Sequence, residues 1–165
     1  MRCGLVVLLL FITFSATVMA QFNADDEQQR TLFLETQQKV EQGDIESQFD
    51  LGLMYFYGRG VTQDYSKAIE WYSKAAGQGD ADAQHNLSKM YSDAHGVAQD
   101  YRKAIEWYGK AAEQGYAYAQ LNLGVMYLNG MGVVGDHQKG CPLIMMAVEQ
   151  DVQDAVEIYN SNCAR

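Results

Sequence analysis

A nineteen-residue stretch occurs twice in this chain, and this repetition constrains the fold more than any other feature. Residues 61–79 read VTQDYSKAIEWYSKAAGQG and residues 97–115 read VAQDYRKAIEWYGKAAEQG, so fifteen of the nineteen positions are identical at an offset of 36 residues. An internal repeat of this length indicates a stack of similar helical or mixed units, in which each unit buries its apolar face against the next.

The same offset extends over three copies without a gap. Seven residue types recur in register: Leu51/Leu87/Leu123, Tyr55/Tyr91/Tyr127, Gly60/Gly96/Gly132, Val61/Val97/Val133, Asp64/Asp100/Asp136, Lys67/Lys103/Lys139 and Ala75/Ala111/Ala147. We therefore predict three full repeats over residues 44–79, 80–115 and 116–150. A capping helix within residues 21–43 and another within 151–165 would be half-repeats that cover the two ends of the stack.

Each copy is predicted to form a helix, a loop and a second helix, so the fold class is all-α. In the first copy, apolar residues over 45–57 follow a helical period, glycines break the chain at 58–60, and Asp64 is placed to cap a second helix. The third copy departs from this pattern, because Gly-Cys-Pro-Leu at 140–143 replaces Ala-Ile-Glu-Trp. We expect its second helix to start late, with Pro142 in the first turn.

The first twenty residues have the pattern of a secretory signal peptide. Arg2 precedes a short apolar run over 5–14, and Val18-Met19-Ala20 ends in a small residue, after which cleavage is predicted. An uncleaved N-terminal anchor is the alternative interpretation. Cleavage implies a periplasmic or secreted protein. The formal net charge of −9 argues against nucleic acid and anionic membranes as partners, and is compatible with a basic partner.

The residues shared by the copies resemble a known repeat. The pattern Leu-Gly-x-Met-Tyr, Gly-x-Gly-Val, Asp-Tyr-x-Lys-Ala, Glu-Trp-Tyr-x-Lys-Ala-Ala and Gln-Gly over about residues 44–150 resembles the Sel-one-like repeat (SLR), a relative of the tetratricopeptide repeat. The resemblance implies a right-handed α-solenoid of antiparallel helix pairs. It also implies that the first helix of each pair lines a concave surface, where members of the family hold protein or peptide partners.

Mapping these helices onto related repeats places one set of residues on the concave side. The predicted partner-binding residues are Phe49, Leu53, Phe56, Tyr57, His85, Lys89, Asp93, Leu121, Val125 and Leu128, with Ser92 and Asn129 beside them. Copies one and three supply apolar and aromatic side chains, and copy two supplies polar ones, as suits a peptide or helical partner. The alternative is self-packing, in which Phe49 and Phe56 contact the N-terminal helix.

The sequence thus predicts a protein–protein interaction module that is monomeric, binds a protein or peptide of unidentified type and needs no cofactor. Two other functions stay open. One is a scaffold that self-associates through residues 121–128. The other is a penicillin-binding or β-lactamase-like enzyme, because some cysteine-rich secreted relatives are described in that way. Against the enzyme, no serine in the chain is followed three residues later by the lysine that such enzymes use.

Cysteines and histidines offer few chemical sites. Cys3 would leave with the signal peptide, and Cys141 and Cys163 would remain as a pair near the turn at Gln150. In an oxidising compartment this pair is predicted to form a disulfide, with two reduced thiols as the alternative. The histidines His85, His95 and His137 lack metal-ligand spacing and are expected at the surface.

Three further patterns are interpreted as structural. GMGVVG at 130–135 matches a dinucleotide-binding fingerprint, but a predicted helix rather than a strand precedes it, so a loop is favoured. Glu70 and Glu106 recur on successive second helices among lysines and alanines, as expected of a solvated helix face. Trp71 and Trp107 are expected to pack between helices. No catalytic or metal-binding residues are predicted.

Overall fold

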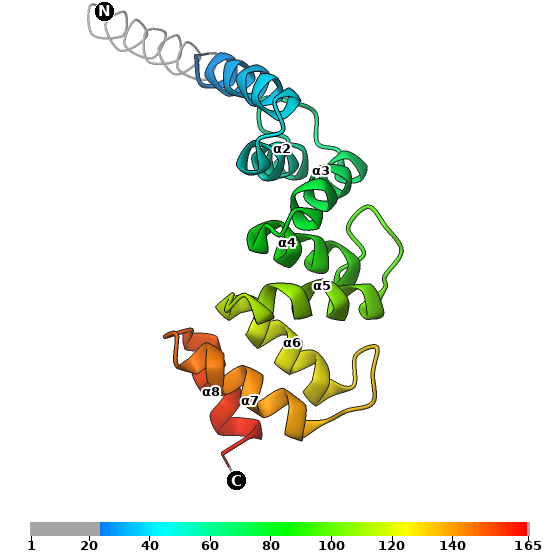
Figure 1. Ribbon diagram of the computed structural model, residues 1–165, viewed down its shortest axis with the longest axis vertical. Coiled ribbons are helices and arrows are strands. Elements are labelled where there is room, and N and C mark those ends of the chain that lie inside the picture. The colour runs from blue at the N-terminus through cyan, green and yellow to red at the C-terminus, as the bar shows by residue number, and fades with distance from the viewer. Residues whose placement is uncertain (1–23, 165) are drawn as a thin grey trace, which may run out of the picture.

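The computed structural model describes residues 24–164, and all regular secondary structure in that range is helical. A helix over 24–41 is followed by α2 (Ile45–Tyr57), α3 (Tyr65–Gly77), α4 (Ala81–Ser92), α5 (Tyr101–Glu113), α6 (Ala117–Asn129), α7 (His137–Val148) and α8 (Gln153–Asn162). Figure 1 shows these helices stacked in sequence order into an elongated solenoid, with the helix over 24–41 at one end and α8 at the other. The predicted all-α solenoid is confirmed, whereas the predicted signal peptide over 1–20 lies outside the described residues.

We call α2, α4, α6 and α8 the A helices and α3, α5 and α7 the B helices. Each B helix packs between the A helix before it and the A helix after it. Fully buried alanines make this possible, since Ala68 and Ala104 at the same repeat position are both 0% exposed. None of the helices in the described range is long and apolar enough to cross a membrane.

The recurring glycines at 60, 96 and 132 hold successive repeats together through their loops. All three have left-handed backbone, with φ of 68°, 71° and 75°. A Cβ atom on Gly96 would lie 2.3 Å from the Cβ of Tyr65, and one on Gly132 would lie 2.6 Å from the Cβ of Tyr101. The loops at Gly96 and Gly132 therefore press their backbone against the start of the previous B helix, and only glycine satisfies both the space and the dihedral angle there.

The expectation that the second helix of copy three starts late is wrong. α7 begins at His137, and the Asp136 side chain accepts a hydrogen bond from the Lys139 backbone N–H at 3.1 Å. Asp136 is held in place because its own N–H donates to the Tyr127 carbonyl at 2.8 Å, as Asp64 does to Tyr55 in copy one. Pro142 lies inside this helix, where its nitrogen cannot donate a hydrogen bond, and the helix nevertheless continues to Val148.

Copy three also has the closest packing of an A helix on a B helix. A Cβ added to Gly124 of α6 would lie 2.9 Å from the Gly140 carbonyl oxygen and 2.6 Å from Ile144 Cγ1. A Cβ added to Gly140 of α7 would lie 2.8 Å from the Gly124 carbonyl oxygen. The two glycines thus allow backbone to approach backbone. The apparent degradation of this repeat in sequence is in part a replacement of alanine by glycine for close packing.

Replacing Gly124 with alanine is expected to destabilise the protein by about 1–3 kcal/mol, because a backbone carbonyl cannot move aside as a flexible side chain can. Gly109 of α5 is a matched control, since a Cβ there meets nothing within 4 Å. Gly109→Ala should stabilise the protein by about 1 kcal/mol through helix propensity. Urea denaturation measures both changes, and equal effects of the two substitutions would contradict the packing argument.

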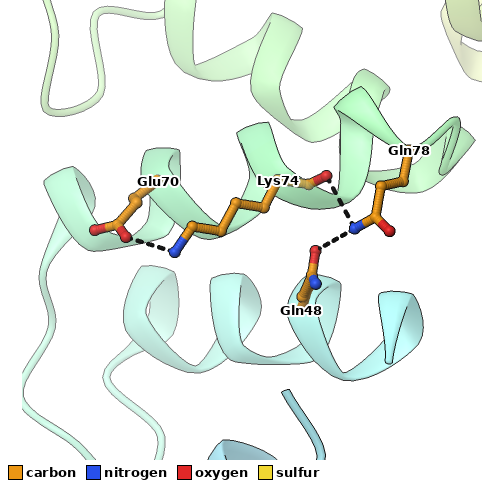
Figure 2. Close-up of polar contacts among 4 residues, drawn as sticks. All are labelled: Gln48, Glu70, Lys74 and Gln78. Atoms are coloured by element: carbon orange, nitrogen blue, oxygen red, sulfur yellow. Dashed lines mark hydrogen bonds and ion pairs between the residues drawn. The ribbon is translucent and has the colours of Figure 1, made fainter. Parts of the chain in front are cut away.

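A ladder of glutamine pairs links neighbouring helices at the other edge of the stack. The Gln78 side-chain amide donates to the Gln48 side-chain oxygen at 2.7 Å, as Figure 2 shows. The same bond recurs one and two repeats later, from Gln114 to Gln84 at 2.8 Å and from Gln150 to Gln120 at 2.9 Å. The acceptor glutamines are buried, so these bonds satisfy polar groups that would otherwise be costly to bury.

Candidate functional site

Three successive A helices form the walls of a cavity of about 400 Å³. Five of the predicted partner-binding residues line it: His85, Lys89, Asp93, Leu121 and Val125. Tyr108 of α5, Tyr118 and Asn122 of α6 and Asp154 of α8 also line the cavity, and sequence analysis did not select these four. The structure therefore brings predicted residues of copies two and three together, and it adds α8 as a third wall.

His85 lies in a ring of aromatic and polar side chains, so the expectation of a surface histidine is wrong for this residue. The His85 ring centroid is 5.1 Å from that of Tyr116 and 5.6 Å from that of Tyr108. The Asn122 Nδ2 atom is 3.2 Å from His85 Nε2. Burial and the nearby Lys89 charge lower the pKa of His85 to about 4. His85 is therefore neutral near pH 7 and its Nε2 is an acceptor for the Asn122 amide.

Two tyrosines beside His85 stay protonated near pH 7. Burial raises the pKa of the buried Tyr108, whose hydroxyl accepts from Asn122 Nδ2 at 3.4 Å. Burial, with the adjacent Asp82, raises the pKa of Tyr116 to about 12. The Tyr116 hydroxyl donates to Asp82 Oδ1 at 2.8 Å. The network around His85 is thus fixed by hydrogen bonds, and the cavity has a rigid inner wall.

The predicted residues of copy one are mostly packed within the protein. Phe49 stacks on Tyr72 of α3 with ring centroids 5.8 Å apart. The Phe56 ring centroid is 5.3 Å from that of Tyr65 and 5.7 Å from that of His95 in the next repeat. Both phenylalanines are half-buried, so the self-packing alternative holds for them, with α3 and the following loop as ring partners. Sequence reasoning had named the N-terminal helix instead.

Two predicted residues of copy one remain available. Tyr57 is 57% exposed, with the Arg59 guanidinium 4.7 Å above its ring. Leu53 lines a separate hollow beside Leu32 of the N-terminal helix. This hollow continues the A-helix surface toward the N-terminal end, and it gives copy one an apolar contact area outside the main cavity.

The apolar residues of copy three form a supporting wall. Leu121 is buried at 6% exposure against Ile144 and Val152, and Val125 and Leu128 are half-buried in the same cluster. The exposed aromatic side chain of this copy is Tyr118, at 54% exposure. The sequence could have pointed to Tyr118. The residues at the same position in the repeat, 36 residues apart, are the acidic Glu46, Asp82 and Asp154, and Tyr118 is the exception.

Cys141 and Cys163 lie at disulfide distance, with 2.00 Å between the sulfurs and 5.6 Å between the Cα atoms. They join α7 to the end of α8. Because α8 carries Asp154, this link holds one wall of the cavity in place.

The remaining sequence patterns have structural roles. The 130–135 motif is a loop after α6, with Gly130 as the left-handed C-cap. Glu70 forms an exposed ion pair with Lys74 at 2.7 Å (Figure 2). The Lys74 ammonium also lies 3.8 Å from the Trp71 ring centroid. In residues 24–164, His, Cys, Asp and Glu side chains form no group of three or more that could hold a metal ion.

Comparison with known families identifies the repeat. The Sel1 repeat model matches residues 45–80, 81–116 and 117–141, which is more than half of the chain. The chain belongs to the Sel1 repeat family. Sel1 repeats form protein–protein interaction modules and generally act as non-enzymatic scaffolds. A comparison with curated proteins gives no significant match.

Solved Sel1 repeat structures resemble this one. A Sel1 repeat protein from Oxalobacter formigenes is 33% identical, with a TM-score of 0.73 over 77% of this chain and 52% of its own. A protective antigen of uropathogenic Escherichia coli with an SLR fold is 30% identical, with a TM-score of 0.76 over 81% of this chain and 30% of its own. The chain thus spans about half or less of these relatives. Cysteine-rich protein B of Helicobacter pylori shares the fold at 24% identity and a TM-score of 0.58, over 73% of this chain and 92% of its own.

Proposed function

We propose that this Sel1 repeat protein binds a protein or peptide partner on the surface of its A helices, in the periplasm or outside the cell. The observation that carries the proposal is the cavity formed by α4, α6 and α8. Side chains separated by about 70 residues in sequence, such as His85 and Asp154, line one hollow there. Concave sites with a few fixed polar groups and aromatic walls are typical of ligand recognition.

The side chains at this site are suited to binding. The polar network of His85, Asn122 and Tyr108 is already formed without a partner, so little entropy is lost in ordering it. Tyr118 adds an exposed aromatic ring at the edge, and tyrosine is enriched among residues that dominate interface energies. The signal-peptide pattern of residues 1–20 supports the proposed location.

The test is quantitative affinity capture from cell-envelope extract and culture medium, read by mass spectrometry. A Tyr118→Ser variant removes the exposed ring, and an Arg102→Ala variant changes an exposed residue of the B helix α5 as a control. A true partner is expected to be retained by the control and depleted about tenfold or more by Tyr118→Ser. A partner that both variants retain equally would place the binding surface elsewhere.

Variants at Phe49 or Phe56 are less suitable for this test, although both residues were predicted to bind. Each packs against other rings of the protein, so a charged substitution would damage the fold as well as the surface. The exposed Tyr118 separates binding from stability.

A further inference from the structure

Charge is segregated between the two layers of helices. Over α2 to α8, the A helices carry one basic residue, Lys89, against five acidic ones: Glu46, Asp50, Asp82, Asp154 and Glu157. The B helices carry three acidic residues against six basic ones: Lys67, Lys74, Arg102, Lys103, Lys110 and Lys139. The formal net charge of −9 for the whole chain hides this difference, because the two helix types alternate along the sequence.

Much of the positive charge on the B helices already has a partner within the protein. Lys74 and Lys110 pair with Glu70 and Glu106 at 2.7 and 2.9 Å. Lys103 and Lys139 lie 4.0 and 3.8 Å from the aspartates that cap their helices. Lys67 lies 5.0 Å from the Tyr55 ring centroid. These contacts hold the B-layer cations beside anions or rings.

The A-helix surface keeps its negative charge. Burial raises the pKa of Asp50, and the nearby charges of Glu46 and Asp44 raise it further. At the cavity, Asp93 lies at the end of α4 and Asp154 lies in the first turn of α8, and both are exposed. Tyr108 and Tyr118 supply aromatic rings in the same cavity. Carboxylates beside aromatic rings form a favourable environment for a cationic side chain.

We infer that the partner of this surface is a basic peptide segment, and that one of its arginine or lysine side chains enters the cavity between α4, α6 and α8. The guanidinium or ammonium group would lie near Asp93 and Asp154, with its aliphatic stem against the tyrosine rings. Lys89 lines the same cavity and repels a second cation, so it limits where the basic side chain can lie. This inference rests on the proposed function and names the chemistry of its partner.

The test starts from a phage-displayed library of random decapeptides selected on the purified protein. Enriched peptides are expected to share arginine or lysine at one fixed position. A synthetic peptide of this kind should lose about tenfold in affinity when that residue is replaced by citrulline or glutamine, because a charge-assisted contact is lost. Its binding should also weaken as ionic strength rises.

Variants of the protein locate the contact. Asp93→Asn/Asp154→Asn is expected to weaken the selected peptide about tenfold or more, whereas Lys89→Gln should strengthen it about threefold by removing a like charge. Glu113→Gln on the B helix α5 is the matched control, because Glu113 is an exposed carboxylate that does not line the cavity, and affinity should stay within about twofold.

The possible failures are distinguishable. Selected peptides that lose binding in Tyr118→Ser but have no required basic residue would overturn this inference and leave the proposed function intact. No enriched peptide, or peptides indifferent to Tyr118→Ser, would count against both. A salt-sensitive dimer in sedimentation equilibrium that dissociates in Asp93→Asn/Asp154→Asn would mean that the basic B helices of a second copy cover the A helices. That result would also overturn the inference.

Discussion

A Cys141→Ser/Cys163→Ser variant is expected to unfold with a free energy about 3 kcal/mol lower than that of the wild-type protein. The two cysteines are separated by 22 residues, and a cross-link over a loop of that length removes much conformational freedom from the unfolded chain. Urea denaturation measures the change. The oxidised wild-type protein should show the higher midpoint, and the wild-type protein in reducing agent should match the variant.

The loss is expected to fall mainly on α8. This helix has one buried residue, Ala155, and its N-cap Val152 provides no side-chain hydrogen bond. Hydrogen exchange should therefore accelerate over residues 153–162 in the variant more than over α4 or α6. Since Asp154 lies on α8, reduction of the disulfide should also lower the affinity of the cavity for any ligand. Unchanged stability and exchange would show that packing alone holds the helix.

Stability is expected to fall by up to about 3 kcal/mol as the pH decreases from about 6.5 to about 4, because of His85. Burial lowers the pKa of His85 from 6.5 to about 4 in the folded protein. Between these two values the unfolded chain binds a proton that the folded protein does not, so acid favours unfolding. The contribution is fully present above pH 6.5 and is lost as the pH approaches 4.

The repeat itself provides the control for this prediction. Phe49 occupies the position of His85 one repeat earlier and stacks on Tyr72 as His85 stacks on Tyr108. A His85→Phe variant should keep the fold and flatten the pH dependence between 6.5 and 4 relative to wild type. His137→Gln, at an exposed position, should leave the wild-type dependence unchanged. The free energy of unfolding is measured by urea denaturation at several pH values. If it falls equally with pH in wild type and His85→Phe, His85 is not the group responsible.

The repeat period was sufficient to predict the architecture. Matches at a spacing of 36 residues identify positions with the same environment, so Asp64 and Asp136 cap corresponding helices in the structure. The loop predicted at 130–135 is confirmed, and a helix precedes it as expected. The predicted late start of α7 was wrong. The Asp136 cap and the loop contact that all three copies share set the start of the helix, and Pro142 does not displace it.

The sequence by itself determined that this chain stacks helix pairs, since a strict period carries that information along the chain. Tertiary structure alone decided which side chains of the A helices stay available. Phe49, Phe56 and Leu121 follow the predicted helical positions, yet rings and aliphatic chains from other helices cover them. Tyr118, Asn122 and Asp154 line the cavity because α8 folds back beside α6. Exposure depends on neighbours distant in sequence, and a single periodic pattern does not specify them.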